Sequence, residues 1–221
     1  MTAIDLSHEM HEGTPHPEAA AAASFEVIQE LGPKLSQITA FSLCTHMGTH
    51  MDAPSHFVVG AKTITDYDID RFSLRGVVAR PALGDRVEIE VSDLESIEKH
   101  LSAGCALLIA TGMDVHYGTP DYARHPYLSR AAAEWIREHE VSLVGIDFMT
   151  PDMPIHLRPA GYTCPVHMEL LGNDILIIEN LTRLLSFDDE VVDLVAAPLA
   201  LTGLDGAPVR VVARSLERTS A

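Results

Sequence analysis

The chain has 221 residues, of which 47% are hydrophobic, and its formal net charge at pH 7 is −17. This length and apolar content suffice for one globular core, so we expect a single domain over residues 1–221. The 32 acidic residues outnumber the 15 basic ones, and such a field repels a phosphate backbone and an anionic membrane surface. We therefore expect no nucleic-acid partner and no membrane partner.

The cysteines and the first residues of the chain bear on its cellular compartment. Cys44, Cys105 and Cys164 are scattered without a CxxC spacing, and their number is odd. The chain does not open with a basic stretch followed by an apolar one, which a secretory signal would require. These features argue against a disulfide framework and against export. We expect a soluble protein of the reducing cytoplasm.

Apolar runs rich in Val and Ile, bounded by Gly, Pro or Asp, predict strands along the chain. In chain order these runs are 76–83, 87–91, 105–111, 141–148, 175–178, 191–196 and 208–213. Some of the runs follow one another without an intervening helical pattern. This order favours a mixed sheet over a regular alternation of strands and helices.

Helical patterns lie between some of these runs. They predict helices at 92–104, 130–139 and 165–172. Ser92 and Glu95 have the spacing of a capping box at the start of the first helix. Ser129 precedes the second, and Pro165 suits the first turn of the third.

The segment from His46 to His56 concentrates residues that can bind a metal ion. Three of the twelve histidines lie in it, with Asp52 between them. Because Gly48 and Pro54 are poor helix-interior residues, we expect an extended segment in which every second side chain, from position 46 to position 56, faces one way. Such imidazole and carboxylate ligands suit zinc, manganese or iron, and Gly48 would leave space for the ion and a water. A polar loop with only local hydrogen bonds is the alternative.

A second cluster lies more than a hundred residues downstream. Glu179 ends the predicted strand at 175–178, and His167 lies on the preceding predicted helix. A buried carboxylate without a partner costs several kcal/mol, so it needs a cation or strong hydrogen bonds. For Glu179, metal ligation, a salt bridge and a strand end turned to solvent all remain open. For His167, ligation and an ordinary position on a helix face remain open.

Two motifs indicate a known family. Residues 46–56 read His-Met-Gly-Thr-His-Met-Asp-Ala-Pro-Ser-His, and His167 is followed twelve residues later by Glu179-Asn-Leu. Together with the opening Ile4-Asp-Leu-Ser and the stretch Val144-Gly-Ile-Asp, they resemble the metal-dependent cyclase and hydrolase family typified by bacterial kynurenine formamidase, with isatin hydrolase as a relative. The resemblance implies an α/β fold with a mixed sheet of partial barrel character and flanking helices, of the swivelling β/β/α type. It also implies a homodimer.

The resemblance implies roles for individual residues as well. The five implied metal ligands are His46, His50, Asp52, His167 and Glu179. The first three would hold one divalent ion, zinc or manganese, and Asp52 with the last two would hold a second, so that the two carboxylates bridge the ions. His56 would be the catalytic acid and base.

The implied reaction is hydrolysis of a small amide, most directly N-formyl-L-kynurenine to L-kynurenine and formate, by hydroxide generated at the metal. The family's early Pro-x-Pro segment carries a tryptophan in kynurenine formamidases, whereas this chain has His16 between Pro15 and Pro17. His16 is therefore a candidate substrate contact, and a cyclic amide, imide or lactone is the alternative substrate. A catalytically silent metal-binding protein of the same fold is a further alternative, against which the intact His56 argues.

Overall fold

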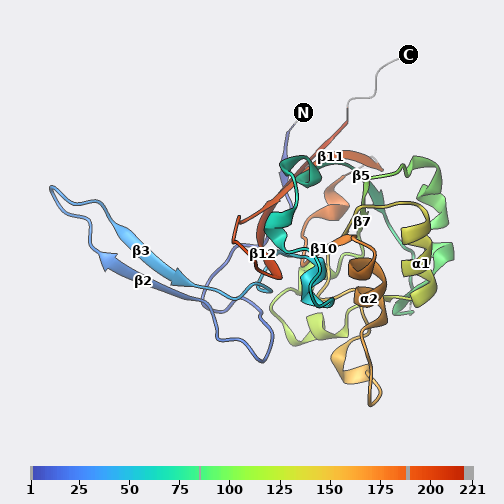
Figure 1. Ribbon diagram of the computed structural model, residues 1–221, viewed down its shortest axis with the longest axis horizontal. Coiled ribbons are helices and arrows are strands. Elements are labelled where there is room, and N and C mark those ends of the chain that lie inside the picture. Colours follow the sequence, from blue (N-terminus) through green and yellow to red (C-terminus); the bar gives the residue numbers. More distant parts are fainter. Residues whose placement is uncertain (1, 85, 188–189, 217–221) are drawn as a thin grey trace.

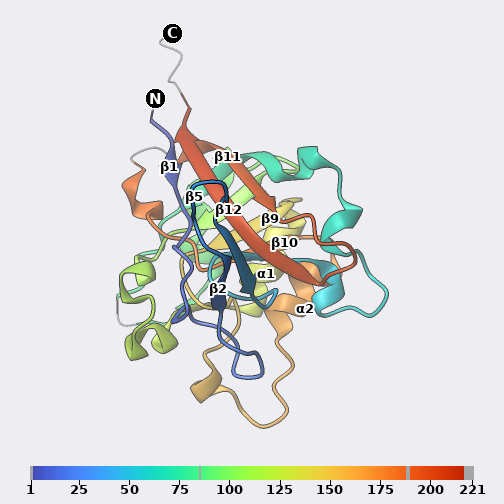
Figure 2. The ribbon, with the colours of Figure 1, turned by 90° about the vertical axis from the view of Figure 1, so that its left-hand side faces the viewer.

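The computed structural model describes residues 2–84, 86–187 and 190–216. The strands of its main sheet are β1 (Ile4–Asp5), β4 (His50–Asp52), β5 (Ser73–Ala79), β7 (Ala106–Ile109), β9 (Leu143–Ile146), β10 (Leu176–Glu179), β11 (Val191–Pro198) and β12 (Gly206–Ser215). They follow the order β1-β12-β11-β5-β7-β9-β10-β4, and β12 also pairs with β4. This extra pairing closes seven strands into a barrel, with β1 attached alongside β12 (Figure 2). The predicted mixed sheet is confirmed, and its barrel is closed rather than partial.

One wall of the barrel is parallel and carries the two α-helices. Strands β5, β7, β9 and β10 are parallel neighbours, and helices α1 (Arg130–Glu138) and α2 (Pro165–Gly172) lie beside one another at this wall (Figure 1). Ser129 Oγ accepts a hydrogen bond from Ala132 N and so caps α1. Pro165 occupies the first turn of α2. Both helices lie where the sequence predicts them.

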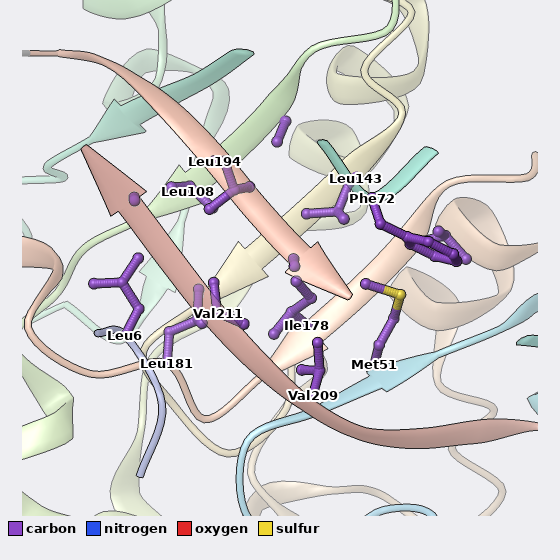
Figure 3. Packing of buried hydrophobic residues seen from close by; sticks show 14 of the residues in the cluster. Leu6, Met51, Phe72, Leu108, Leu143, Ile178, Leu181, Leu194, Val209 and Val211 are labelled. Atoms are coloured by element: carbon purple, nitrogen blue, oxygen red, sulfur yellow. The ribbon is translucent and has the colours of Figure 1, made fainter. Parts of the chain in front are cut away.

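Both faces of this wall are buried. On β7, Leu108 belongs to the cluster that fills the barrel, whereas its neighbour Leu107 packs in the cluster beneath the helices. Met51 of β4 and Ile178 of β10 also belong to the interior cluster (Figure 3). Strands buried on two faces read as continuous apolar runs rather than as an alternation. That is why the sequence marks them clearly.

The helix predicted at 92–104 is wrong. This segment forms two 3-10 helices, η4 (Val91–Asp93) and η5 (Glu95–His100). The capping box lies two residues earlier than predicted, since the backbone N–H of Glu90 donates to Asp93 Oδ2 at 2.9 Å. Asp93 therefore closes a tight first turn, and a new 3-10 turn begins beyond Leu94 instead of an α-helix.

The remaining elements are short. The other 3-10 helices are η1 (Pro54–His56), η2 (Ile64–Asp66), η3 (Ile69–Phe72), η6 (Met113–His116), η7 (Pro120–Arg124), η8 (Ile155–Leu157) and η9 (Leu184–Ser186). Strands β6 (Glu88–Ile89) and β8 (Tyr127–Leu128) pair in parallel. Strands β2 (Ser24–Gln29) and β3 (Ile38–Ser42) form a hairpin that projects from the barrel (Figure 1), and no apolar run had predicted it. In the described part of the chain, no helix has the length and apolar composition to cross a membrane.

Candidate metal centre

Strand β4 places two of the candidate ligands on one face of the barrel wall. It pairs with β10 on one side, where His50 lies opposite Glu179 and Asp52 lies opposite Ile177. Side chains directly opposite each other in an antiparallel pair project from the same face. His50, Asp52 and Glu179 therefore share the outer face, whereas Met51 points into the barrel. The predicted parity holds for this strand.

The sequence predicted an extended conformation over the whole of 46–56, but only part of this segment is extended. The strand covers only His50–Asp52, and Pro54 begins the 3-10 helix η1. Gly48 has a φ of +61°, which favours glycine because it lacks a Cβ. A Cβ there would lie 3.4 Å from Met10 and from Thr14. Gly48 thus makes a turn against the N-terminal segment, and it does not line a space for an ion.

A second glycine admits His46 to the site. Gly206 of β12 lies opposite Asp52, and a Cβ on it would lie 3.0 Å from the imidazole carbon Cε1 of His46 and 2.7 Å from the carbonyl oxygen of Met51. The bare backbone of Gly206 therefore lets the His46 ring approach the strand. His46 Nδ1 lies 2.7 Å from Asp52 Oδ1 as a result.

Each of the two buried carboxylates, Asp52 and Glu179, has one oxygen near His50 and the other near His167. Asp52 Oδ1 lies near His46 and His50, while its other oxygen, Oδ2, lies 3.7 Å from His167 Nε2. Glu179 behaves alike, with Oε2 at 3.4 Å from His50 Nε2 and Oε1 at 3.3 Å from His167 Nε2. The two segments predicted separately, 46–56 and 167–179, thus form one cluster.

The surroundings of His50 Nε2 indicate whether this cluster can bind a metal ion. It is buried and has no hydrogen-bond partner among the described residues, a state that costs about 1–3 kcal/mol unless a ligand removes it. Ligand atoms about 2.1 Å from a tetrahedral ion lie about 3.4 Å apart. His50 Nε2 lies 3.4 Å from both Asp52 Oδ1 and Glu179 Oε2. The donor set therefore fits a divalent metal ion.

Asp152 orients His167 from behind. Its carboxylate is fully buried, accepts hydrogen bonds from the backbone N–H groups of Val166 and His167, and lies 2.6 Å from His167 Nδ1. It caps the first turn of α2 in place of Cys164, whose side chain makes no such bond. With Nδ1 engaged by Asp152, Nε2 is the nitrogen that faces the carboxylates.

We expect Asp152→Asn to weaken metal binding by about 10- to 100-fold, the usual effect of losing a carboxylate behind a ligating histidine. Asparagine keeps the shape but loses the charge that holds the His167 ring. Competition with a coloured chelator measures the affinity. Asp121→Asn is the matched control, because Asp121 is exposed and pairs only with exposed Arg124 among the described residues. An Asp152→Asn affinity within twofold of the unaltered protein would contradict this role.

Asp205 connects His46 with His56. Its Oδ2 lies 2.9 Å from His46 Nε2 and 3.3 Å from His56 Nδ1. The two rings stack with their centroids 3.8 Å apart. Asp205 therefore holds His56 beside the ligand cluster.

The local charges give the histidines different protonation states. Burial disfavours the charged form of His46, but the hydrogen bonds and charges of Asp52 and Asp205 outweigh it and raise the pKa to about 9. Burial likewise opposes protonation of His167, yet its contacts with Asp152, Asp52 and Glu179 hold its pKa well above the usual value. For His56, burial dominates and lowers the pKa. The cluster thus attracts positive charge, whereas His56 is neutral at pH 7.

We expect the metal-free protein to lose stability as the pH rises from about 6.5 to about 9. His46 binds its proton up to about pH 9 in the folded state but only up to about pH 6.5 in the unfolded chain. This stabilisation is complete below pH 6.5 and disappears as the pH passes 9. Thermal denaturation in chelator should show Tm falling by at least about 5 °C. His46→Gln should flatten the fall, and a Tm that stays level or rises would contradict the expectation.

A pocket of about 450 Å³ opens over the cluster, within the range of about 300–1,000 Å³ found for small-molecule sites. Its lining includes all five candidate ligands, His56, Phe57, Arg158 and the N-terminal residues Pro17, Ala19 and Ala20. His16 lies elsewhere, since it lines a separate hollow with Tyr122 and Met149, and its Nδ1 lies 3.0 Å from the carbonyl oxygen of Pro17. The structure thus brings together every candidate site residue except His16.

No sequence pattern predicted a role for Asp152 or Asp205. Asp152 precedes His167 by fifteen residues, and Asp205 lies in a loop far from every motif. Carboxylates are common in this acidic chain, and neither one ends a predicted strand. No local signal separated them from the exposed acids, because their roles come from contacts across the fold.

Comparisons with known proteins agree with this geometry. The sequence profile of the putative cyclase family matches residues 4–153. The kynurenine formamidase of Bacillus cereus (strain ATCC 14579) is 32% identical over 227 residues, covering 96% of this chain and 97% of its own. That of Geobacillus thermodenitrificans is 32% identical over 222 residues, with the same coverage.

Solved structures share the fold. Isatin hydrolase A from Labrenzia aggregata, bound to benzyl benzoate, superposes with a TM-score of 0.86 at 23% identity and covers 98% of this chain and 94% of its own. A potential metal-dependent hydrolase with cyclase activity has a TM-score of 0.76 at 24% identity, covering 97% and 99%. The named relatives are enzymes, and the chain is a hydrolase of the same family. The chain belongs to the cyclase family of metal-dependent hydrolases, as its two motifs predicted.

Proposed function

We propose that the protein is an arylformamidase-like amidohydrolase that cleaves N-formyl-L-kynurenine to L-kynurenine and formate. The observation that carries the proposal is the unpartnered, buried His50 Nε2 among the carboxylates of Asp52 and Glu179, with His56 beside them in one pocket. The relatives named kynurenine formamidase indicate that the substrate is an amide. Together they support hydrolysis of an aryl formamide.

The catalytic roles follow from the side chains. The five candidate ligands would hold a divalent ion, which would lower the pKa of a bound water and polarise a carbonyl oxygen. His56 is neutral at pH 7 and lines the pocket, so it accepts the proton of the attacking water and returns it to the leaving nitrogen. Asp205 accepts a hydrogen bond from Nδ1 of His56, which leaves the lone pair of Nε2 available as the base.

We propose two ions per subunit, zinc or manganese. The two oxygens of Asp52 lie near different histidines, and so do the two oxygens of Glu179, so each carboxylate would be able to serve two ions. Elemental analysis of protein purified without added metal gives the identity and the number of ions. A content of one ion per chain at saturation would refute the second site.

The activity is tested by formate release. Chelated protein should be inactive on N-formyl-L-kynurenine and should recover activity with zinc or manganese. Formate and L-kynurenine should appear in equal amounts. If metal-replete protein leaves N-formyl-L-kynurenine intact, the proposed activity is wrong.

Hydrolysis of a cyclic amide, imide or lactone is the second candidate. One observation favours it: the N-terminal segment lines the pocket with Pro17, Ala19 and Ala20 and brings no aromatic ring, while His16 lies outside. Isatin and a lactone assayed beside N-formyl-L-kynurenine decide by their relative kcat/KM. His16 stays a predicted substrate contact, and an unchanged kcat/KM in His16→Ala would remove it.

We further propose that the chain is one domain and acts in the cytoplasm. We also propose that it forms a homodimer through the β2–β3 hairpin. A two-stranded hairpin is marginally stable alone in water, and exposed apolar patches mark interaction surfaces. Seven large apolar side chains of residues 25–41 are exposed, namely Phe25, Val27, Ile28, Leu31, Leu35, Ile38 and Phe41. Light scattering should give the mass of two chains, and Phe41→Asp should give that of one. A monomeric unaltered protein would exclude the dimer.

A further inference from the structure

Arg158 differs from the other residues that line the pocket. Among the described lining residues it is the one Lys or Arg side chain. It follows η8 directly, in the segment between β9 and α2. An arginine that borders the pocket of a chain with a net charge of −17 can attract an anionic substrate group.

Contacts within the loop hold the Arg158 side chain in place. Its Nε donates a hydrogen bond of 2.7 Å to the carbonyl oxygen of Met153. Its guanidinium carbon lies 5.3 Å from the centroid of the Tyr162 ring, within the range of a cation–π contact. Tyr162 in turn donates a hydrogen bond to Asp152 Oδ1. Asp152 also contacts His167. The Arg158 guanidinium is therefore connected through Tyr162 and Asp152 to a candidate metal ligand.

The guanidinium has no carboxylate partner within the described residues. No ion pair joins Arg158 to any of the acidic side chains in that part of the chain, and Nε is its one nitrogen with a hydrogen bond there. The two terminal nitrogens carry four N–H groups in a planar fork, which matches the two oxygens of a carboxylate. The pocket is thus lined both by a guanidinium group free to bind an anion and by the candidate metal ligands.

We propose that Arg158 determines substrate specificity by binding a carboxylate of the substrate, so that the pocket selects aryl formamides that carry a negative charge. This inference rests on the proposed function, because it places the formamide at the metal cluster. N-formyl-L-kynurenine carries such a carboxylate, and its methyl ester has the same ring and formamide without the charge. The pair isolates the contribution of the carboxylate to recognition.

The test compares kcat/KM for the acid and the methyl ester in the unaltered, metal-loaded protein and in Arg158→Gln. Because hydrogen bonds between ionised groups are among the stronger ones in proteins, the unaltered protein should prefer the acid by about 10- to 100-fold. Arg158→Gln should reduce this preference to about twofold, mainly through KM, and should leave kcat/KM for the ester within about twofold. Arg130→Gln, a change on the exposed surface of α1, should keep the preference intact.

Two results overturn the proposal. One is an equal loss for acid and ester in Arg158→Gln, which would mean that Arg158 only supports the loop. The other is an unchanged preference for the acid. If the unaltered protein cleaves neither compound, the proposed function has failed, and calorimetric binding of L-kynurenine and its methyl ester then tests Arg158 alone. Weaker binding of the acid alone in Arg158→Gln supports the carboxylate site, and equal binding by the two proteins refutes it.

Discussion

The Asp52→Asn variant is expected to bind metal at least about 100-fold more weakly than the unaltered protein and to lose nearly all activity. Asp52 is fully buried, with one oxygen 2.7 Å from His46 and the other 3.7 Å from His167. The amide of asparagine removes the negative charge between these rings and replaces one ligand oxygen with a nitrogen that cannot bind metal. The loss of metal affinity should exceed about 10- to 100-fold, which is typical when a residue that hydrogen-bonds to a metal ligand is replaced.

Equilibrium dialysis with elemental analysis measures the affinity, and a formate assay measures the activity. Asp147→Asn is a suitable control, because Asp147 is also fully buried but its carboxylate accepts hydrogen bonds from Thr111 and Gly112 and not from a candidate ligand. Burial raises the pKa of Asp147 to about 6, so Asp147→Asn removes a charge that its surroundings disfavour. An Asp52→Asn protein with unaltered metal content would show that the cluster is not the metal site.

The His56→Ala variant should lose about 10²- to 10⁴-fold in kcat, the usual contribution of a general acid or base, while its metal content stays within about twofold. The ring lines the pocket and is held by Asp205 rather than being enclosed by the carboxylates. Its removal therefore takes away the proposed proton carrier and leaves the five candidate ligands in place.

The metal content of His56→Ala separates two roles. Ring atoms of His56 lie close enough to Asp52 and His167 for a shared ion, so a sixth ligand is the competing interpretation. Loss of both metal and activity would establish His56 as a ligand, whereas loss of activity alone establishes the acid and base. His116→Ala is the control, because His116 is exposed on η6, and it should match the unaltered protein.

Helix α2 and strand β10 show where local patterns suffice. Pro165 and the apolar spacing predicted the helix with its observed bounds, and the run at 175–178 lies within one residue of the strand. The helix signal comes from the fixed backbone angle of Pro165 in the first turn. The strand signal comes from the burial of β10 on both faces. The segment 92–104 shows the limit, because a tighter turn made by Asp93 competed with the predicted cap and prevailed.

The hairpin and the exact course of residues 46–49 needed the tertiary structure. The hairpin lacks a buried face of its own in the described chain, so its side chains carry no clear in-and-out pattern. The turn at Gly48 depends on Asn180, whose Nδ2 donates to the Gly48 carbonyl oxygen at 2.8 Å. Such a contact between residues so far apart leaves no spacing signal.

The amino-acid sequence alone predicted the types of candidate ligand, their grouping into two motifs and the chemistry that such ligands favour, because donor atoms and short spacings are local properties. The fold decided which of these residues meet. Closure of the barrel places β4 between β10 and β12, which sets His50 opposite Glu179 and brings Gly206 beside His46. The carboxylates that orient the rings, Asp152 and Asp205, arrive through packing across the whole chain, so no reading of neighbouring residues could identify them.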